Sequence, residues 1–131
     1  MNWFLAKTDP ETYSLDQLER DKRTAWDGVK NPQAVRAIRE MRPGDGVFIY
    51  HSGGQPAVVG IARVLSEPRD DPKDGKSAVV DLEFVRRLAT PATLAEIRAS
   101  NRFADWALVH QPRLSTMRAP EAFVKWMQAR A

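Results

Sequence analysis

The stretch from Trp26 to Ala34, WDGVKNPQA, places an aromatic side chain just before a helix start. Asn31 followed by Pro32 predicts an N-cap and a first helical residue, because the asparagine side chain satisfies a free backbone N–H and proline has none to satisfy. Apolar residues then recur at helical spacing as far as Met41, where a Pro-Gly pair ends the pattern. A helix is therefore expected to begin at Pro32, with one apolar face and one basic face.

The positive charge of the chain gathers around this junction. Residues 20–42 include seven Lys or Arg and three Asp or Glu, a net charge of +4, whereas the whole chain carries +3. A helix N-terminus also offers free N–H groups and a partial positive charge, which suit an anion or the polar edge of a ligand. Clustered arginine on a small domain is typical of phosphate binding. The expected phosphate-binding residues are Lys30, Arg36, Arg39, Arg42 and, further along the chain, Arg113.

The length and composition indicate one domain spanning residues 1–131, with enough apolar residues for a core and too few residues for two domains. No apolar run is long enough for a membrane span, and the N-terminus lacks the features of a signal peptide. We therefore expect a soluble, cytoplasmic protein that does not bind membranes. The chain has no cysteine and two histidines, so we expect no disulfide and no metal site. Nothing in the sequence indicates a cofactor, and a monomer is the default expectation.

Apolar runs and alternating patterns predict the strands. Gly60, inside one of the apolar runs, indicates a bulge or a close approach of two backbones. The segment 66–76 is rich in Pro, Asp and Gly, so we expect an exposed loop there. The predicted strands cover residues 2–7, 47–52, 57–65, 78–88 and 113–117.

Capping boxes predict two short helices, one after Ser14 and one after Thr93, because each residue is followed three positions later by Gln or Glu. A closing helix is expected from Pro120, with an apolar stripe of Phe123, Val124, Trp126 and Met127. Short strands with helices inserted between them predict an α+β domain built on a curled, barrel-like sheet.

Three parts of the chain together resemble the EVE domain family, a member of the PUA-like superfamily that includes the YTH domains. They are KTDPETY at residues 7–13, WDGVKN at residues 26–31, and VFIYHS with VGIA at residues 47–52 and 59–62. The similarity continues through residues 91–94 and 113–115, and so covers nearly the whole chain. It implies a PUA-like pseudo-barrel of about five to six short strands with helices between and around them.

The resemblance also implies a pocket that accepts one nucleobase, which is methylated or otherwise modified in several relatives. By position, Trp26 would form an aromatic wall, with Asn31, Asp9 and Ser52 near the edge of the base. Pro32 stands where relatives usually have an aromatic residue, which removes a possible stacking partner. The remaining pocket candidates are Lys7, Tyr13, Gln33, Tyr50, His51 and Ser115.

These features favour a non-catalytic module that binds DNA or RNA carrying a modified base, and two alternatives stay open. The first is an enzyme acting on nucleic acid or nucleotides, with His51 and Ser52 as its reactive pair. Adjacent strand residues point to opposite faces, and the sequence has no P-loop or nucleophile elbow, so this alternative has little support. The second is a module that binds a protein or a small anion at the helix start. At the level of single residues, Trp26 as a core anchor and Asn31 as a simple cap also fit the sequence.

Overall fold

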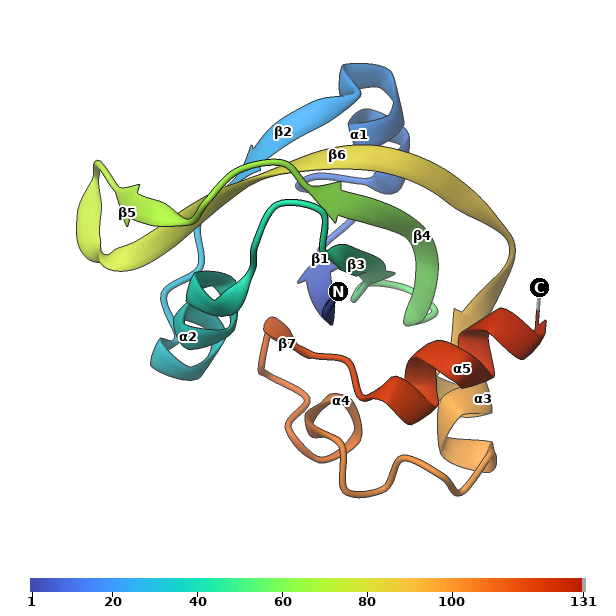
Figure 1. Cartoon of the computed structure of the whole chain (residues 1–131). Coiled ribbons are helices and arrows are strands. Elements are labelled where there is room, and N and C mark those ends of the chain that lie inside the picture. The colour runs from blue at the N-terminus through green and yellow to red at the C-terminus, as the bar shows by residue number, and fades with distance from the viewer. Residues whose placement is uncertain (131) are drawn as a thin grey trace.

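A curved sheet of seven strands organises residues 1–130, the part of the chain described by this computed structural model (Figure 1). Six strands follow one another in the order β2-β6-β4-β3-β1-β7, and β5 pairs with β6. The strands are β1 (Trp3–Thr8), β2 (Arg23–Trp26), β3 (Gly46–His51), β4 (Ala57–Val64), β5 (Arg69–Asp71), β6 (Asp74–Thr93) and β7 (Thr116–Arg118). The helices are α1 (Leu15–Asp21), α2 (Pro32–Glu40), α3 (Leu94–Ala99), α4 (Ala107–His110) and α5 (Glu121–Arg130).

Strand β6 gives the sheet its curvature. It is 20 residues long and pairs antiparallel with β2, β4 and β5, so that it arcs over the other strands in Figure 1. Its pairing with β4 shifts register on both sides of Gly60. A Cβ atom on Gly60 would lie 2.7 Å from Leu15 Cδ1 and 3.0 Å from the Arg86 carbonyl oxygen. The predicted bulge and close approach at Gly60 are therefore confirmed.

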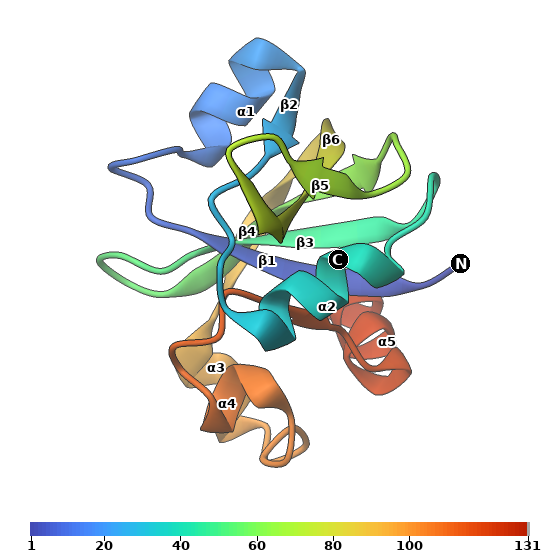
Figure 2. The same ribbon diagram turned by 90° about the vertical axis from the view of Figure 1, so that its left-hand side faces the viewer.

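The helices cover the sheet from opposite sides. Figure 1 and Figure 2 both place α1 with β2 on one side of strands β1, β3 and β4, and α3, α4 and α5 on the other. On the α5 side, Phe123 is fully buried and packs edge-on against Phe48 of β3, with 5.3 Å between ring centroids. No helix among residues 1–130 is long and apolar enough to cross a membrane.

The helix starts follow the local signals in the sequence. Asn31 caps α2, with its side-chain oxygen 2.8 Å from the backbone nitrogen of Gln33 and 3.3 Å from that of Ala34. Ser14 and Thr93 form the two predicted capping boxes, at the starts of α1 and α3. The predicted helices and the α+β fold class are confirmed.

The structure corrects three predictions about strands. Residues 66–76 are not only a loop, because β5 pairs with the start of β6 in a hairpin. The polar segment before Trp26 forms the edge strand β2, and the last strand begins at Thr116 rather than at residue 113. Strand β5 is largely exposed, and in β2 Trp26 is the one buried residue, so neither short segment shows the run of alternating apolar residues that marks a half-buried strand.

Candidate functional site

A cavity of about 460 Å³ opens to solvent where β1 and β2 end, and we call it the Trp26 cavity. Three separate segments meet around it: the end of β1 with the loop that follows, the edge strand β2 with the turn after it, and the residue before β7. The lining residues are Lys7, Thr8, Thr12, Tyr13, Thr24, Ala25, Trp26, Asp27, Gly28, Val29 and Ser115. Strand pairing therefore joins residues from the two ends of the chain in one hollow.

Trp26 forms the aromatic wall of this cavity and is also part of the core. Its side chain is 8% exposed, and its backbone pairs with Val80 in the β2–β6 ladder. The Tyr13 ring meets it edge-on, with centroids 6.3 Å apart and an interplanar angle of 84°. An indole held in this way has little freedom to move, so the wall is preformed.

The polar lining offers both donors and acceptors. The Lys7 ammonium donates to the Pro112 carbonyl oxygen over 3.0 Å, and burial lowers the pKa of Lys7. The Tyr13 hydroxyl donates to an Asp21 carboxylate oxygen over 2.8 Å, and burial is the main cause of its raised pKa. Within residues 1–130, no hydrogen bond involves the side chains of Thr12, Asp27 or Ser115, which leaves these groups for a ligand.

The turn that closes the cavity depends on Gly28. Its φ of +76° lies in the left-handed region, which residues with a side chain rarely adopt. The chain turns there from β2 toward α2, and the next residue, Val29, is buried. The WDG sequence therefore sets the position of Trp26 relative to the start of α2.

Six of the predicted pocket residues lie outside the lining and have structural contacts instead. Asp9 accepts a hydrogen bond from the Glu11 backbone N–H at 2.9 Å, and the Ser52 hydroxyl donates to the Thr8 carbonyl oxygen at 3.4 Å. Tyr50 is buried, with the Lys7 ammonium 5.5 Å from its ring centroid. The other three are Asn31, which caps α2, Gln33 in the first turn of α2, and His51, which bonds to the start of α1.

Four predicted residues do line the cavity, namely Lys7, Tyr13, Trp26 and Ser115. The sequence reasoning missed seven others. The motif that marked Trp26 could have indicated three of them, Asp27, Gly28 and Val29, since they follow it directly. Thr8, Thr12, Thr24 and Ala25 give no such signal.

The arginines of α2 and of the turn after it differ in their availability. Arg39 pairs with Asp70 of β5 at 2.9 Å, and Arg42 lies 3.6 Å from Glu67 in the segment before β5. Arg36, by contrast, is exposed and has no ion pair among residues 1–130, and the same holds for Lys30 and Arg113. The acidic β5 hairpin thus neutralises part of the predicted phosphate-binding cluster.

Comparison with known proteins identifies the family. Residues 2–129 match the profile of the EVE domain. The chain belongs to the EVE domain family. Mouse thymocyte nuclear protein 1 is 33% identical over 125 residues, which cover 74% of this chain and 55% of that protein. The chain thus spans about half the length of the curated relatives it matches.

Solved EVE domain relatives share the whole fold. Rpa0253 from Rhodopseudomonas palustris is 37% identical, with a TM-score of 0.90 over 96% of this chain and 90% of that chain. A hypothetical protein from Leishmania major is 29% identical, with a TM-score of 0.89 over 99% and 96%. The human THYN1 protein, solved in complex with DNA containing 5-methylcytosine, is 22% identical and has a similar fold, with a TM-score of 0.89 over 98% and 96%. The family resemblance seen in the sequence is confirmed.

His51 gives this EVE domain a pH-dependent contact beside the Trp26 cavity. Its Nε2 accepts a hydrogen bond from the Leu15 N–H, the first free N–H of α1, over 3.0 Å. Only the neutral ring can accept this bond, and burial, the main cause, lowers the pKa of His51 below its ordinary value of 6.5. The folded state therefore binds this proton less readily than the unfolded chain does.

We predict that the free energy of unfolding falls as the pH drops below about 6.5, since the unfolded chain takes up a proton there that the folded state resists. The contribution is fully present above that pH and is lost as the pH falls through the lowered pKa. Urea unfolding over a pH series measures it. His51→Gln keeps an acceptor without a titrating group and should flatten the curve in this range; a wild-type curve that is already flat would contradict the assignment. Asp74 and Glu96 have pKa values lowered from 3.8 and 4.5, so their protonation changes the free energy of unfolding only in more acidic solution.

Proposed function

We propose that this EVE domain is a non-catalytic module that binds nucleic acid and takes one nucleobase, methylated or otherwise modified, into the Trp26 cavity. One observation carries the proposal: an aromatic wall and unused hydrogen-bonding side chains line the same solvent-open cavity. The relative that was solved with DNA containing 5-methylcytosine supports it, because it has the same fold. The nucleic-acid partner is DNA or RNA.

Energetics favour a base that is already unpaired. Extruding a base from a duplex costs a few kcal/mol, and stacking on one aromatic side chain returns about 1–3 kcal/mol. These two terms nearly cancel for a duplex, whereas a single strand avoids the cost of extrusion. A buried methyl group adds about 0.8 kcal/mol, or roughly fourfold in affinity. Larger discrimination must come from polar groups such as Asp27 and Ser115, which a wrong base would leave unpaired.

The contacts of the predicted reactive pair support binding rather than catalysis. The ring nitrogen of His51 is occupied by the Leu15 N–H, so it is not placed to act as a general base. The Ser52 hydroxyl bonds to a backbone oxygen of β1 and not to His51. Turnover of a nucleotide that is lost in Ser52→Ala would instead support the enzyme alternative.

The proposal predicts tight, salt-sensitive binding of a labelled single strand that contains 5-methylcytosine. Arg36→Gln should weaken it and lower the slope of log Kd against log salt by about 0.7, because one phosphate contact is lost. Arg39→Gln is the matched control on the same helix and should have a smaller effect, because Arg39 is already paired with Asp70. Fluorescence anisotropy at several salt concentrations measures both slopes.

Two results would contradict the proposal. The first is an absence of binding to methylated and unmodified single strands alike at low salt. The second is equal affinity for the methylated strand and for one with an abasic site in place of the methylated base, since the cavity would then hold no base. Equal effects of Arg36→Gln and Arg39→Gln would contradict only the assignment of phosphate contacts.

A further inference from the structure

A second cavity, of about 280 Å³, lies between α5 and the concave sheet, and we call it the α5 cavity. It shares no lining residue with the Trp26 cavity. Its walls come from β1, β3, β4 and β6 and from α5. The lining residues are Trp3, Phe48, Ile61, Arg86, Leu88, Ala89, Thr90, Val124, Met127, Gln128 and Arg130.

Strand register places the sheet residues of this cavity side by side. Phe48 pairs with Ile61, and Ile61 pairs with Arg86, so these three form a row across β3, β4 and β6. Leu88 and Thr90 follow Arg86 at alternate positions of β6, and alternate residues of a strand share a face. On α5, Val124, Met127 and Gln128 have the i, i+3, i+4 spacing of one helical face. The cavity is thus a regular product of strand and helix periodicity.

The aromatic wall of the α5 cavity is rigid. The Trp3 indole stacks on Phe48, with 4.7 Å between ring centroids and an interplanar angle of 24°. Gly46 makes room for this indole, since a Cβ atom there would clash with the Trp3 ring. Phe48 is in turn held by Phe123 of α5. A flat apolar surface is therefore ready for a ligand, and a preformed site loses little entropy on binding.

The charges around the α5 cavity are not balanced. None of its lining residues is acidic, and two are arginines. Arg130 is engaged, because its guanidinium pairs with Glu96 at 2.7 Å and lies 5.0 Å from the Trp126 ring centroid. Arg86 is exposed and has no ion pair or side-chain hydrogen bond among residues 1–130. One unpaired guanidinium thus stands at the edge of an apolar hollow.

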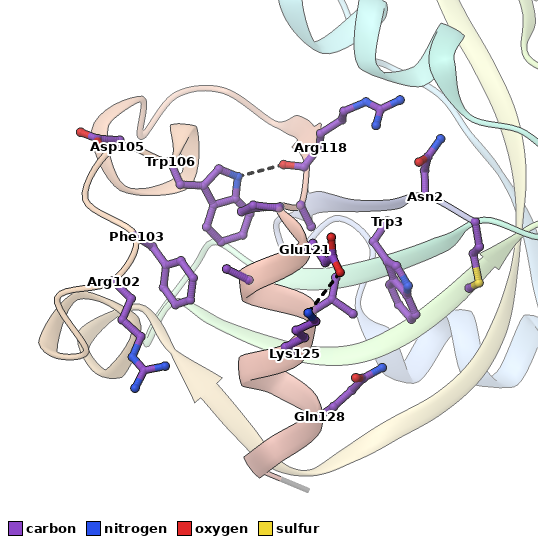
Figure 3. A pocket seen from close by; sticks show the side chains of 15 residues that line it. Asn2, Trp3, Arg102, Phe103, Asp105, Trp106, Arg118, Glu121, Lys125 and Gln128 are labelled. Atoms are coloured by element: carbon purple, nitrogen blue, oxygen red, sulfur yellow. Dashed lines mark hydrogen bonds and ion pairs between the residues drawn. The ribbon is translucent and has the colours of Figure 1, made fainter.

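A larger groove beside this cavity is lined by charges of both signs. It runs around the first turns of α5 and shares Trp3, Val124 and Gln128 with the α5 cavity, and Figure 3 shows Phe103 and Trp106 on the other side of the helix. Two of its charged side chains bind each other, since Glu121 pairs with Lys125 at 3.2 Å, and Arg118 pairs with Glu40 of α2 at 2.9 Å. Arg102 and Asp105 also line the groove and have no ion pair among residues 1–130. The groove gives access to Trp3, but its unpaired charges are of both signs, so it does not favour an anion as the α5 cavity does.

We propose that the α5 cavity binds a small organic acid whose apolar, preferably aromatic, body lies against Trp3 and Phe48 while its carboxylate pairs with Arg86. Pockets of this kind are mostly apolar, with a few polar groups that fix the orientation of the ligand. A guanidinium matches a carboxylate with two parallel hydrogen bonds, which explains a preference for an acid over an alcohol of the same shape. The site does not depend on nucleic-acid binding, since its residues lie outside the Trp26 cavity.

Titration of the full chain with phenylbutanoate, with phenylbutanol as its neutral counterpart, tests the proposal. NMR shifts of the Trp3 side-chain N–H and of the Met127 methyl group report on the cavity. The acid should bind saturably and roughly tenfold more tightly than the alcohol, because its hydrogen bonds are charge-assisted. Arg86→Gln should remove this preference. Arg87→Gln is the matched control, since its guanidinium is bound to Asp16 and Glu19 of α1, and it should keep the preference.

A cavity-filling variant makes the test independent of charge. Leu88 is partly exposed, so Leu88→Phe should fold normally and weaken both probes. The proposal is overturned if neither probe gives a saturable shift, if the acid and the alcohol bind equally, or if the shifts appear at Trp26 instead. Shifts of Trp3 that grow with protein concentration without a probe would also overturn it, because a second copy of the chain would then fill the hollow.

Discussion

Replacing Phe123 by Ala should lower the free energy of unfolding by about 3–5 kcal/mol, the usual cost of removing a buried aromatic side chain. Phe123 is fully buried at the centre of an aromatic cluster. Its ring centroid lies 4.5 Å from that of Trp106, and 5.3 Å from those of Phe48 and Phe103. The truncation would remove contacts between α5, the segment before α4 and the sheet at one point. Urea unfolding followed by tryptophan fluorescence measures the loss.

Lys125→Ala on the same helix is the control for Phe123→Ala. Lys125 is exposed and, among residues 1–130, pairs only with Glu121, one turn earlier, so its removal should change stability by no more than about 0.5 kcal/mol. A loss below about 1 kcal/mol for Phe123→Ala would mean that the aromatic cluster does not hold α5 to the sheet. The α5 cavity would then lack its rigid support, because Phe123 holds Phe48.

The parts of the fold that the sequence predicted depend on local interactions. Asn31 caps α2 through bonds to residues two and three positions away, so the short sequence that follows Asn31 is enough to predict the helix start. The buried strands β3 and β4 likewise carry continuous apolar runs. Strand β5 has neither feature: it is a polar, largely exposed edge strand joined to β6 by backbone bonds, and nothing in its sequence indicates the pairing.

The site was only partly predictable for the same reason. Trp26 lies in a motif, but Lys7 and Ser115 join it through long-range pairing, such as the 2.7 Å bond from the Lys7 N–H to the Ser115 carbonyl oxygen. The availability of the α2 arginines depends on the unpredicted β5 hairpin, which pairs with Arg39 through Asp70. Arg36 and Arg39 are close in sequence, yet Arg39 alone is neutralised, by a residue 31 positions away.

Filling the mouth of the Trp26 cavity should abolish base recognition without weakening the fold. Ala25 lies on the edge strand β2, where it lines the cavity, is exposed and pairs with Asp81 of β6. Ala25→Trp therefore adds an indole outside the core, and β-strands accommodate aromatic residues well. Affinity for the single strand containing 5-methylcytosine should fall by about fivefold or more, because stacking of the base is worth about 1–3 kcal/mol. Anisotropy gives the affinity, and urea unfolding should show unchanged stability.

Ala95→Trp on α3 is the matched control, because it adds the same indole at an exposed position away from the cavity and should leave binding unchanged. Contacts to phosphate do not pass through the cavity, so Ala25→Trp should keep the salt slope of the wild type while losing the preference for the methylated base. Measuring the salt slope together with the preference for the methylated base separates phosphate binding from base recognition. Trp26→Ala cannot separate them, because Trp26 also belongs to the core. Full affinity in Ala25→Trp would show that the base lies elsewhere on the surface. Equal losses in both variants would show that any added surface indole disturbs binding.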